Sequence, residues 1–476
     1  MRAMDITLKV LVALILMMSA PLALKRRWRL FLAIPLSVFQ GFVPWIEVAG
    51  VPIPLAFWGG MLLWPEFVRE FRVVVTWKPT AYLLGLVVLL TASLLWSPER
   101  KLGLQPIGYL FQFVIIFSGV VTEGRRDEKL ILRLMIVTVA FGLIQALSVV
   151  IFRLMPGLKF EYYLSSFARW FISPNVVDKL FTLRQSNILS SIKSGGLGLS
   201  DANDGAAYLG ILAFAALGLA LHLRKRWLGL VSLALLGAVA FTGSKAGLMF
   251  AVALPVLALH FIATHYRGWR NRLRMAMVGI MLAGSLAWVV PKAIQVGETG
   301  GYRALNSFLS RSDTTLSVRE QIWRFGWHVF QRKPFLGQGF GGWQQGFPRY
   351  AHKVGIDPDL PPHNTFIYLW SQGGLLAAFL GAAFMYSVLR FGWRRVRDLR
   401  SEEFGLSLAM MMAFLWAFLY GMGNNSGVVG EVHMSPVLAC LLAMAFLQRR
   451  ANSTVTSNVV IRSQDAPMIT TARVSN

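Results

Sequence analysis

Long apolar runs separated by mostly short polar segments form the main pattern along the chain. Many runs reach about 18–20 residues, the length with which an α-helix crosses the hydrocarbon core of a bilayer. One early run, residues 51–65, is short and contains Pro and Gly, so two early runs could instead form one broken or re-entrant helix. The pattern predicts an all-α polytopic membrane protein with twelve or thirteen transmembrane helices. The candidate spans are residues 6–24, 28–46, 51–65, 80–97, 104–122, 129–153, 203–222, 227–242, 244–264, 273–291, 364–391, 405–422 and 433–448.

The polar segments between the runs indicate which helix ends share a side of the membrane. Short loops rich in Lys and Arg all fall on one side in an alternating count, and such loops face the cytoplasm. They comprise residues 25–29, 69–78, 123–129, 222–227, 265–274 and 390–400. The two longer loops, 154–202 and 292–362, then face outward.

Four parts of the chain follow from this topology. Residues 1–291 are expected to form a helix bundle with an outward loop near 154–202, and residues 292–362 a large outward loop domain. Residues 363–450 are expected to form the C-terminal transmembrane helices. The tail, 451–476, is rich in Ser, Thr and Asn, a composition that predicts a disordered segment on the cytoplasmic side.

The composition is that of a membrane protein, and it includes a net positive charge that needs an explanation. The 476 residues are 55% hydrophobic and 14% charged, where a soluble protein carries about a quarter charged residues. Much of the net charge of +25 lies in the short cytoplasmic loops, so no nucleic-acid partner is expected. The loop 292–362 nevertheless holds nine Lys and Arg against five Asp and Glu. Attraction to anionic membrane lipid explains this excess, and a bound anionic substrate explains it equally.

Two cations stand out by position. Lys245 lies among small residues in TGSKAGL, at the expected outer end of a helix hairpin, and a lysine at membrane depth indicates function. A lysine that snorkels to the interface is the ordinary alternative. Arg319 lies in the first turn of a predicted helix, SVREQIWRFGWHVF, and arginine can hold phosphate oxygens bidentately. Its ordinary role would be a surface ion pair with Glu320 or Glu298.

His363 is the candidate base. A neutral imidazole has a pKa of about 6.5 and can accept a proton near pH 7. In PPHNTF, two prolines stiffen the approach and Asn364 can cap the following helix, which would hold the ring on a rigid element. A structural interface histidine is the alternative. The weaker competitors are His328, His352 and His433, and no histidine pair has the spacing of a zinc site.

Two further outward segments carry carboxylates or amides. Asp201, Asn203 and Asp204 precede a spanning run; they are good helix caps, and an outward helix N-terminus also offers N–H groups to an anion. Glu431 is a candidate second carboxylate in the last outer turn.

The loop 292–362 holds two more motifs. Asp357 and Asp359 could hold a metal ion with a diphosphate, but the proline between them favours a plain turn equally. GQGFGG (337–342) matches a dinucleotide-binding pattern only in letters, because no buried strand precedes it, and glycines that allow a tight turn explain it better.

These segments together resemble the superfamily of bacterial O-antigen ligases and O-antigen polymerases, with O-antigen ligases as the nearer match. The resemblance covers the whole arrangement of about a dozen spans with one large outward loop before the last few. The residues that carry it are GLSDANDGAAYL, TGSKAGL, VREQIWRFG, KPFLGQGFGG and PPHNTFIYLWSQGG.

The resemblance implies a glycosyltransferase-C-like fold and an active site on the periplasmic side of the bacterial inner membrane. It implies transfer of a glycan from undecaprenyl diphosphate to the lipid A–core oligosaccharide, by inversion and with neither a metal nor another cofactor. The family usually has arginine where this chain has Lys245. Lys193, ahead of Gly195 and Gly196, matches another family arginine, and Arg184 is its rival.

Site roles follow from the resemblance and the residue chemistry together. His363 would be the base, and Arg319 would act in catalysis and in diphosphate binding. Lys245 and either Lys193 or Arg184 would also bind the diphosphate. Asn364, Asn203 and Asp204 would support these groups.

Four alternatives stay open. A polymerase would extend the same lipid-linked glycan, and a protein O-oligosaccharyltransferase would use a Ser or Thr acceptor. A lipid-linked oligosaccharide transporter should place its charged residues near the bilayer midplane, whereas here they gather in outward loops and at helix ends. A non-catalytic scaffold that binds lipopolysaccharide is the fourth.

Overall fold

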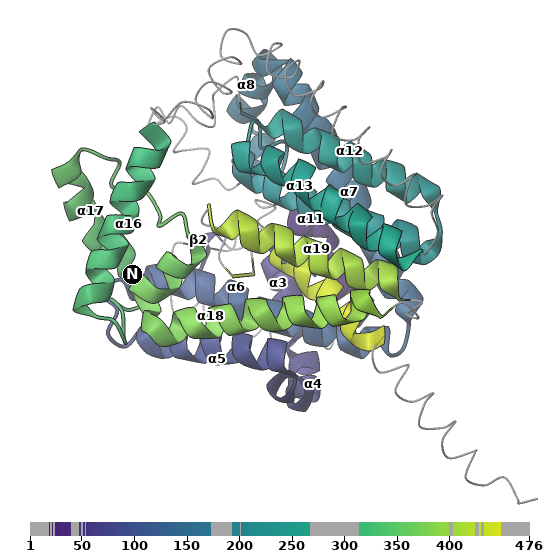
Figure 1. The fold of residues 1–476 in the computed structure, drawn as a ribbon, viewed down its shortest axis with the longest axis horizontal. Helices are drawn as coiled ribbons and strands as arrows, with labels where there is room; N and C mark the ends of the chain where they lie inside the picture. The colour runs from purple at the N-terminus through teal and green to yellow at the C-terminus, as the bar shows by residue number, and fades with distance from the viewer. Residues whose placement is uncertain are drawn as a thin grey trace, which may run out of the picture.

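The computed structural model describes residues 19, 21, 24–39, 47–48, 51–52, 54–172, 193–199, 201–266, 314–398, 403–423, 428–429 and 433–448. Most of these residues are helical (Figure 1). The elements of the first half are α2 (Arg26–Ala33), η1 (Pro35–Val38), β1 (Glu47–Val48), β2 (Val51–Pro52), α3 (Leu55–Met61), α4 (Trp64–Thr76), α5 (Lys78–Ser93), α6 (Arg100–Gly124), α7 (Glu128–Leu154), α8 (Pro156–Leu164) and η2 (Ala168–Trp170). The second half contains α11 (Ala202–Leu223), α12 (Arg226–Thr242), α13 (Lys245–His265), α16 (Thr314–Arg332), α17 (Trp343–Val354), α18 (Thr365–Arg397), α19 (Phe404–Gly421) and a last helix, Ser435–Gln448.

Six of the described helices are long and apolar enough to cross a membrane: α6, α7, α11, α13, α18 and α19. α4 and α5 are long and apolar enough only when they are taken together, and the pair is bent by 107°. α12 and the last helix are apolar but shorter, at 10–17 residues. The helices confirm a polytopic membrane protein.

Several other predicted spans are too short in the structure or lie outside the described residues. α2 and α3, of eight and seven residues, overlap the predicted spans 28–46 and 51–65 and are too short to cross a bilayer. The span 273–291 and most of 6–24 lie outside the described residues, as do much of the two long loops and the tail 451–476. The four-part division of the chain stays a prediction.

Buried ion pairs gather at one end of the bundle. Glu66 is 3% exposed and accepts hydrogen bonds from Arg26 at 2.7 Å and from Arg29 at 3.0 and 3.2 Å. Arg26 also reaches Glu123 at 2.9 Å, and Arg125 reaches Glu70 at 2.6 Å. These contacts bring the basic segments 25–29, 69–78 and 123–129 to one end, as their alternation predicted. We call it the basic end.

The opposite end is where α7 and α19 end and where α11, α13 and α18 begin; we call it the loop end. α19 begins at the basic end, because Leu406 lies beside Gly124 and Leu447 in a small gap of the packing. Its last residues reach the first turns of the other helices: Tyr420 contacts Ser244, and Gly421 accepts a hydrogen bond from Thr365. The loop end therefore assembles helix termini from distant parts of the sequence.

Loss of the Glu66 carboxylate should destabilise the basic end. Glu66→Ala would leave the buried Arg29 without its carboxylate, and breaking one side of a buried pair costs about 3–5 kcal/mol. We expect a clear drop in the thermal unfolding midpoint in detergent. The matched control is Glu320→Ala, which breaks an exposed pair with Arg324 worth less than about 1 kcal/mol. Equal midpoints for the two variants would contradict the stabilising role of the buried pairs.

α18 is not one continuous span, and the predicted span 364–391 is wrong at its start. Gly374 has φ 75° and ψ −174°, which breaks the helix into residues 365–373 and 375–397. Leu369 on the first part packs against Gly381 on the second, although twelve residues of straight helix would separate them by about 18 Å. The first part therefore folds back along the second and carries its N-terminus toward α19.

A loop of glycines holds this break in place. Gly337, Gly339 and Gly341 all have positive φ, and the loop lies directly against the backbone at Ser97 and Gln372. The amide of Gly339 donates to the Gln372 carbonyl at 2.9 Å, and the amide of Gly341 donates to the Gln372 side chain at 2.7 Å. GQGFGG is thus the tight turn that the sequence predicted.

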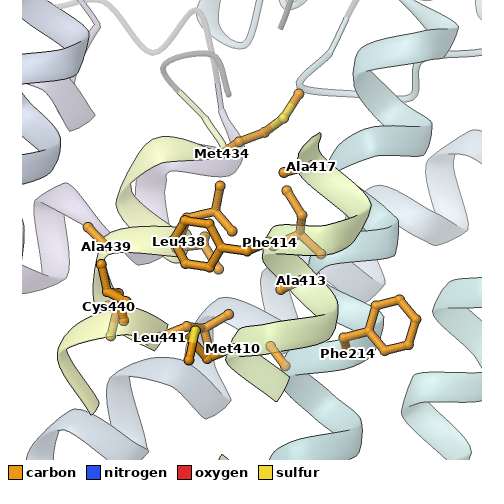
Figure 2. Packing of buried hydrophobic residues seen from close by; sticks show 14 of the residues in the cluster. Phe214, Met410, Ala413, Phe414, Ala417, Met434, Leu438, Ala439, Cys440 and Leu441 are labelled. Carbon is orange, nitrogen blue, oxygen red and sulfur yellow. The ribbon is translucent and has the colours of Figure 1, made fainter. Parts of the chain in front are cut away.

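Two cores support these arrangements. The main core fills the bundle, where the sides of α11, α19 and the last helix meet around Phe214, Phe414 and Leu438 (Figure 2). Cys440 is buried there. A smaller core joins α16 and α17 to the first part of α18, through Ile322, Trp343 and Ile367. α16 and α17 accordingly lie at one side of the bundle, beside the break in α18 (Figure 1).

Candidate active site

His363 lies immediately before α18 on a firmly held loop. Trp343 donates a hydrogen bond to the Leu360 carbonyl at 3.0 Å, and Trp323 donates to the Pro362 carbonyl at 3.3 Å. Asn364 caps α18 as the sequence predicted, because its Oδ1 accepts from the amides of residues 366 and 367 at 2.9 and 3.2 Å. The backbone of His363 has φ 51°, a conformation that costs a non-glycine residue energy and is often found at functional sites.

The same loop is fastened to the end of α19. Asn364 Nδ2 donates to the Met422 carbonyl at 3.2 Å, and Thr365 Oγ1 donates to the Gly421 carbonyl at 3.1 Å. These bonds satisfy carbonyls that the end of a helix leaves without partners. They also bring His363, through the folded-back part of α18, to the helix ends that meet at the loop end.

Arg319 is half-buried on α16, the helix whose Trp323 bonds to the His363 loop, and its charge acts on the His363 ring. α16 begins at Thr314, so Arg319 lies one turn further into the helix than predicted. Its guanidinium lies about 4 Å from where a Cβ on Gly423 would stand, just beyond α19. Glu320 pairs with Arg324 instead, and among the described residues no carboxylate pairs with Arg319. A half-buried guanidinium of this kind is suited to an anion.

The charge environment keeps the His363 ring neutral. Burial and, to a smaller extent, the positive charge of Arg319 lower the pKa of His363 to about 4, although the carboxylate of Asp201 partly opposes both. Nδ1 is shielded from solvent and has no hydrogen-bond partner among the described residues. The imidazole is therefore a neutral acceptor at pH 7, next to a fixed cation.

Asp201, rather than Asn203 or Asp204, caps α11, and its Oδ1 accepts from the Asn203 amide. The Asn203 side chain instead points to the neighbouring helices. Its Oδ1 accepts from Ser244 Oγ at 2.9 Å, and Ser244 in turn lies 2.5 Å from the Tyr420 hydroxyl. Ser244 also caps α13, and its Oγ accepts from the Gly247 amide at 3.3 Å.

Lys245 is the first residue of α13 and is exposed. The N-terminus of a helix carries partial positive charge, so a lysine there adds to a field that attracts anions. Lys193 approaches the same turn, because the amide of the next residue donates to the Thr242 carbonyl at 2.9 Å. The buried Lys159 donates to the Lys193 carbonyl at 2.6 Å, and burial, with the nearby Arg153, lowers the pKa of Lys159 to about 8.

The structure thus brings the segments of His363, Arg319, Asn203, Lys245 and Lys193 together at the loop end. Asp204 lies beside them in the first turn of α11, where its backbone bonds to His433. Arg184, Glu298 and Glu431 lie outside the described residues.

The competing histidines have different surroundings. His328 and His352 are exposed on α16 and α17. His433 is fully buried, and this burial lowers its pKa to about 3 in spite of the bond to Asp204. His363 alone among these four is both held beside a cation and incompletely buried.

The pair Asp357 and Asp359 forms a turn. The Asp357 carboxylate accepts the amide of Asp359 at 2.9 Å, as an aspartate does when it closes a turn. In the described part of the chain, no three His, Cys, Asp or Glu side chains gather as metal ligands would.

Asp201, Ser244 and Tyr420 are neighbours of this site to which the sequence assigned no role in it. Asp201 was recognised only as a cap, and Ser244 only as a small residue. Tyr420 lies inside an apolar run, where nothing distinguishes it from a core aromatic. Its contact with residues 176 and 217 positions away had no local signal.

A family model described as O-antigen ligase matches residues 230–382 of the chain. The matched region runs from α12 to the second part of α18 and includes Lys245, Arg319 and His363. No curated protein matches the chain. The match supports the superfamily that the motifs indicate, which contains both ligases and polymerases.

Proposed function

We propose that this protein is a metal-independent glycosyltransferase that moves an O-antigen glycan from undecaprenyl diphosphate to lipid A–core oligosaccharide. The reaction would complete lipopolysaccharide at the periplasmic face of the inner membrane. The proposal rests on one observation: a neutral, rigidly held imidazole lies near a guanidinium that has no carboxylate partner among the described residues. The match to the O-antigen ligase family over this region supports a lipid-linked glycan as the substrate class.

The donor consists of a lipid tail, a diphosphate and a glycan. The tail would lie in the bilayer against the apolar helices, and the diphosphate would lie at the loop end. There Arg319 and Lys245, with Lys193 or Arg184, would stabilise it. Breaking the bond between the anomeric carbon and the diphosphate oxygen leaves negative charge on the diphosphate. Cations placed in advance stabilise such charge most strongly where water is scarce.

The acceptor hydroxyl would lose its proton to His363. Its oxygen then attacks the anomeric carbon from the face opposite the diphosphate, so the new glycosidic bond forms as the old one breaks. The anomeric configuration inverts. The products are the glycosylated acceptor and undecaprenyl diphosphate, with the proton on the imidazole until solvent removes it.

The pH dependence tests the state of His363. A base must be neutral, and the lowered pKa means that the imidazole stays neutral from pH 7 down to about pH 4. We expect kcat/KM to hold to about pH 5 and to fall near pH 4, rather than near the ordinary histidine pKa of about 6.5. The acid limb of kcat should lie at higher pH, because bound diphosphate offsets the charge of Arg319. An acid limb of kcat/KM at 6.5 would contradict this assignment.

A polymerase is the second candidate, because the superfamily that the motifs resemble contains both activities. The two reactions differ in the acceptor. A protein acceptor would require the same donor site. A transporter fits less well, since the candidate groups lie at the loop end rather than midway along the helices. A scaffold would not need a neutral imidazole beside an arginine.

Reconstitution in liposomes decides among these functions. The purified chain would receive a lipid-diphosphate glycan and rough lipopolysaccharide, with EDTA and no added metal. Glycan on the lipid A–core supports the ligase, and a longer glycan on the lipid carrier supports the polymerase. Movement of the donor between leaflets without a new glycosidic bond supports the transporter. No reaction and no donor movement would overturn the proposal.

A further inference from the structure

The Tyr420 hydroxyl belongs to a buried hydrogen-bond network at the loop end. Tyr420 is 1% exposed and Ser244 is 4% exposed, and their oxygens lie 2.5 Å apart. Either hydroxyl can donate in this contact, and both hydroxyls also lie within hydrogen-bond distance of Asn203 Oδ1, Ser244 at 2.9 Å and Tyr420 at 3.4 Å. The network ties the end of α19 to the beginnings of α11 and α13.

The residues next to Tyr420 hold the base. Gly421 and Met422 supply the carbonyls that accept from Thr365 and Asn364, and these two residues follow His363 directly. The last turn of α19 is therefore bonded on one side to the loop of His363. On the other side it is bonded, through Ser244, to the first turn of α13, which begins with Lys245.

Packing alone does not require the Tyr420 hydroxyl. The ring lies between Trp416, stacked at 6.4 Å, and Phe250 at 6.2 Å, contacts that phenylalanine would make equally well. A buried hydroxyl must find a partner to offset its lost hydration. Its presence in an aromatic cluster therefore indicates a role in joining the helices rather than in filling space.

We infer that Tyr420 is a positioning residue for the glycosyl transfer: its hydroxyl sets the first turn of α13, with Lys245, at a defined separation from His363. The inference rests on the proposed function. The donor diphosphate and the acceptor hydroxyl must both be in place when the bond to the anomeric carbon breaks. A misplacement of about 1 Å can cost a hundredfold in rate.

The test compares Tyr420→Phe with Tyr208→Phe, which removes a hydroxyl from an equally buried tyrosine on α11. We expect Tyr420→Phe to lower kcat about tenfold to a hundredfold while the KM for the donor changes less than about twofold. Tyr208→Phe should keep kcat near wild type. Thermal unfolding midpoints of both variants show whether the loss follows the folded fraction.

Ser244→Ala removes this contact from the other helix, together with the bond to Asn203 and the cap of α13, and it carries the test if Tyr420→Phe does not fold. The double variant should be no slower than the slower single variant, because either single change already removes the contact between Tyr420 and Ser244. Wild-type kcat in Tyr420→Phe, an equal loss in Tyr208→Phe, or additive losses would overturn the inference. An inactive wild type in the same liposomes would instead overturn the proposed function, and with it this role for Tyr420.

Discussion

Replacing His363 by alanine is expected to lower glycan transfer by at least about a hundredfold while the protein remains folded in the membrane. General-base help contributes about 10²–10⁴-fold, and among the described histidines only His363 is held beside Arg319 with its ring partly open. The measurement is the initial rate of transfer in the reconstituted system, divided by the amount of folded protein.

The backbone of His363 calls for a second variant, because its φ of 51° strains most side chains. Asparagine adopts this left-handed conformation more readily than most residues. His363→Asn therefore removes the base with the least change to the loop, and it should be as inactive as His363→Ala. His328→Ala, on the exposed face of α16, is the matched control and should transfer at the wild-type rate. Activity in His363→Asn would exclude His363 as the base.

Arg319→Ala is expected to lower transfer by about 10²–10³-fold, because the charge that develops on the diphosphate loses a fixed partner. Arg319→Lys should recover only part of the rate, since an ammonium cannot hold two phosphate oxygens in the fork of a guanidinium. Initial rates over a range of donor concentrations would separate weaker binding from slower chemistry.

The control for Arg319 lies on the same helix. Arg324 is exposed and already pairs with Glu320 at 2.6 Å, so Arg324→Ala should have little effect on transfer. If Arg324→Ala and Arg319→Ala reduce the rate equally, the effect reflects the net charge of α16 and the specific role of Arg319 is wrong.

Local signals predicted those parts of the structure that depend on neighbouring residues. The long apolar runs became α6, α7, α11, α13 and α19, because an apolar run of that length needs only its own backbone hydrogen bonds to be stable in lipid. Asn364 caps α18, and GQGFGG makes a tight turn, because both depend on the chemistry of a few adjacent residues.

Contacts between distant segments had no such signal. The run 364–391 is mostly apolar, yet α18 breaks at Gly374, where the Phe335 carbonyl lies directly against the helix backbone. α2 and α3 are short although the predicted spans 28–46 and 51–65 are mostly apolar. Nothing in the sequence around Tyr420 or Ser244 indicates their contact, which forms only where α19 and α13 meet.

The amino-acid sequence by itself determined that the chain is a bundle of membrane-length helices with basic short loops, and it named the imidazole and the cations of the candidate site. Hydrophobic length, loop charge and side-chain chemistry are local properties, so they can be read along the chain. Only the tertiary structure decided which helix ends meet. The fold-back at Gly374 and the bonds from α18 to the end of α19 place His363 beside Arg319. These contacts join segments that are far apart in the chain, so no local feature of the sequence could indicate them.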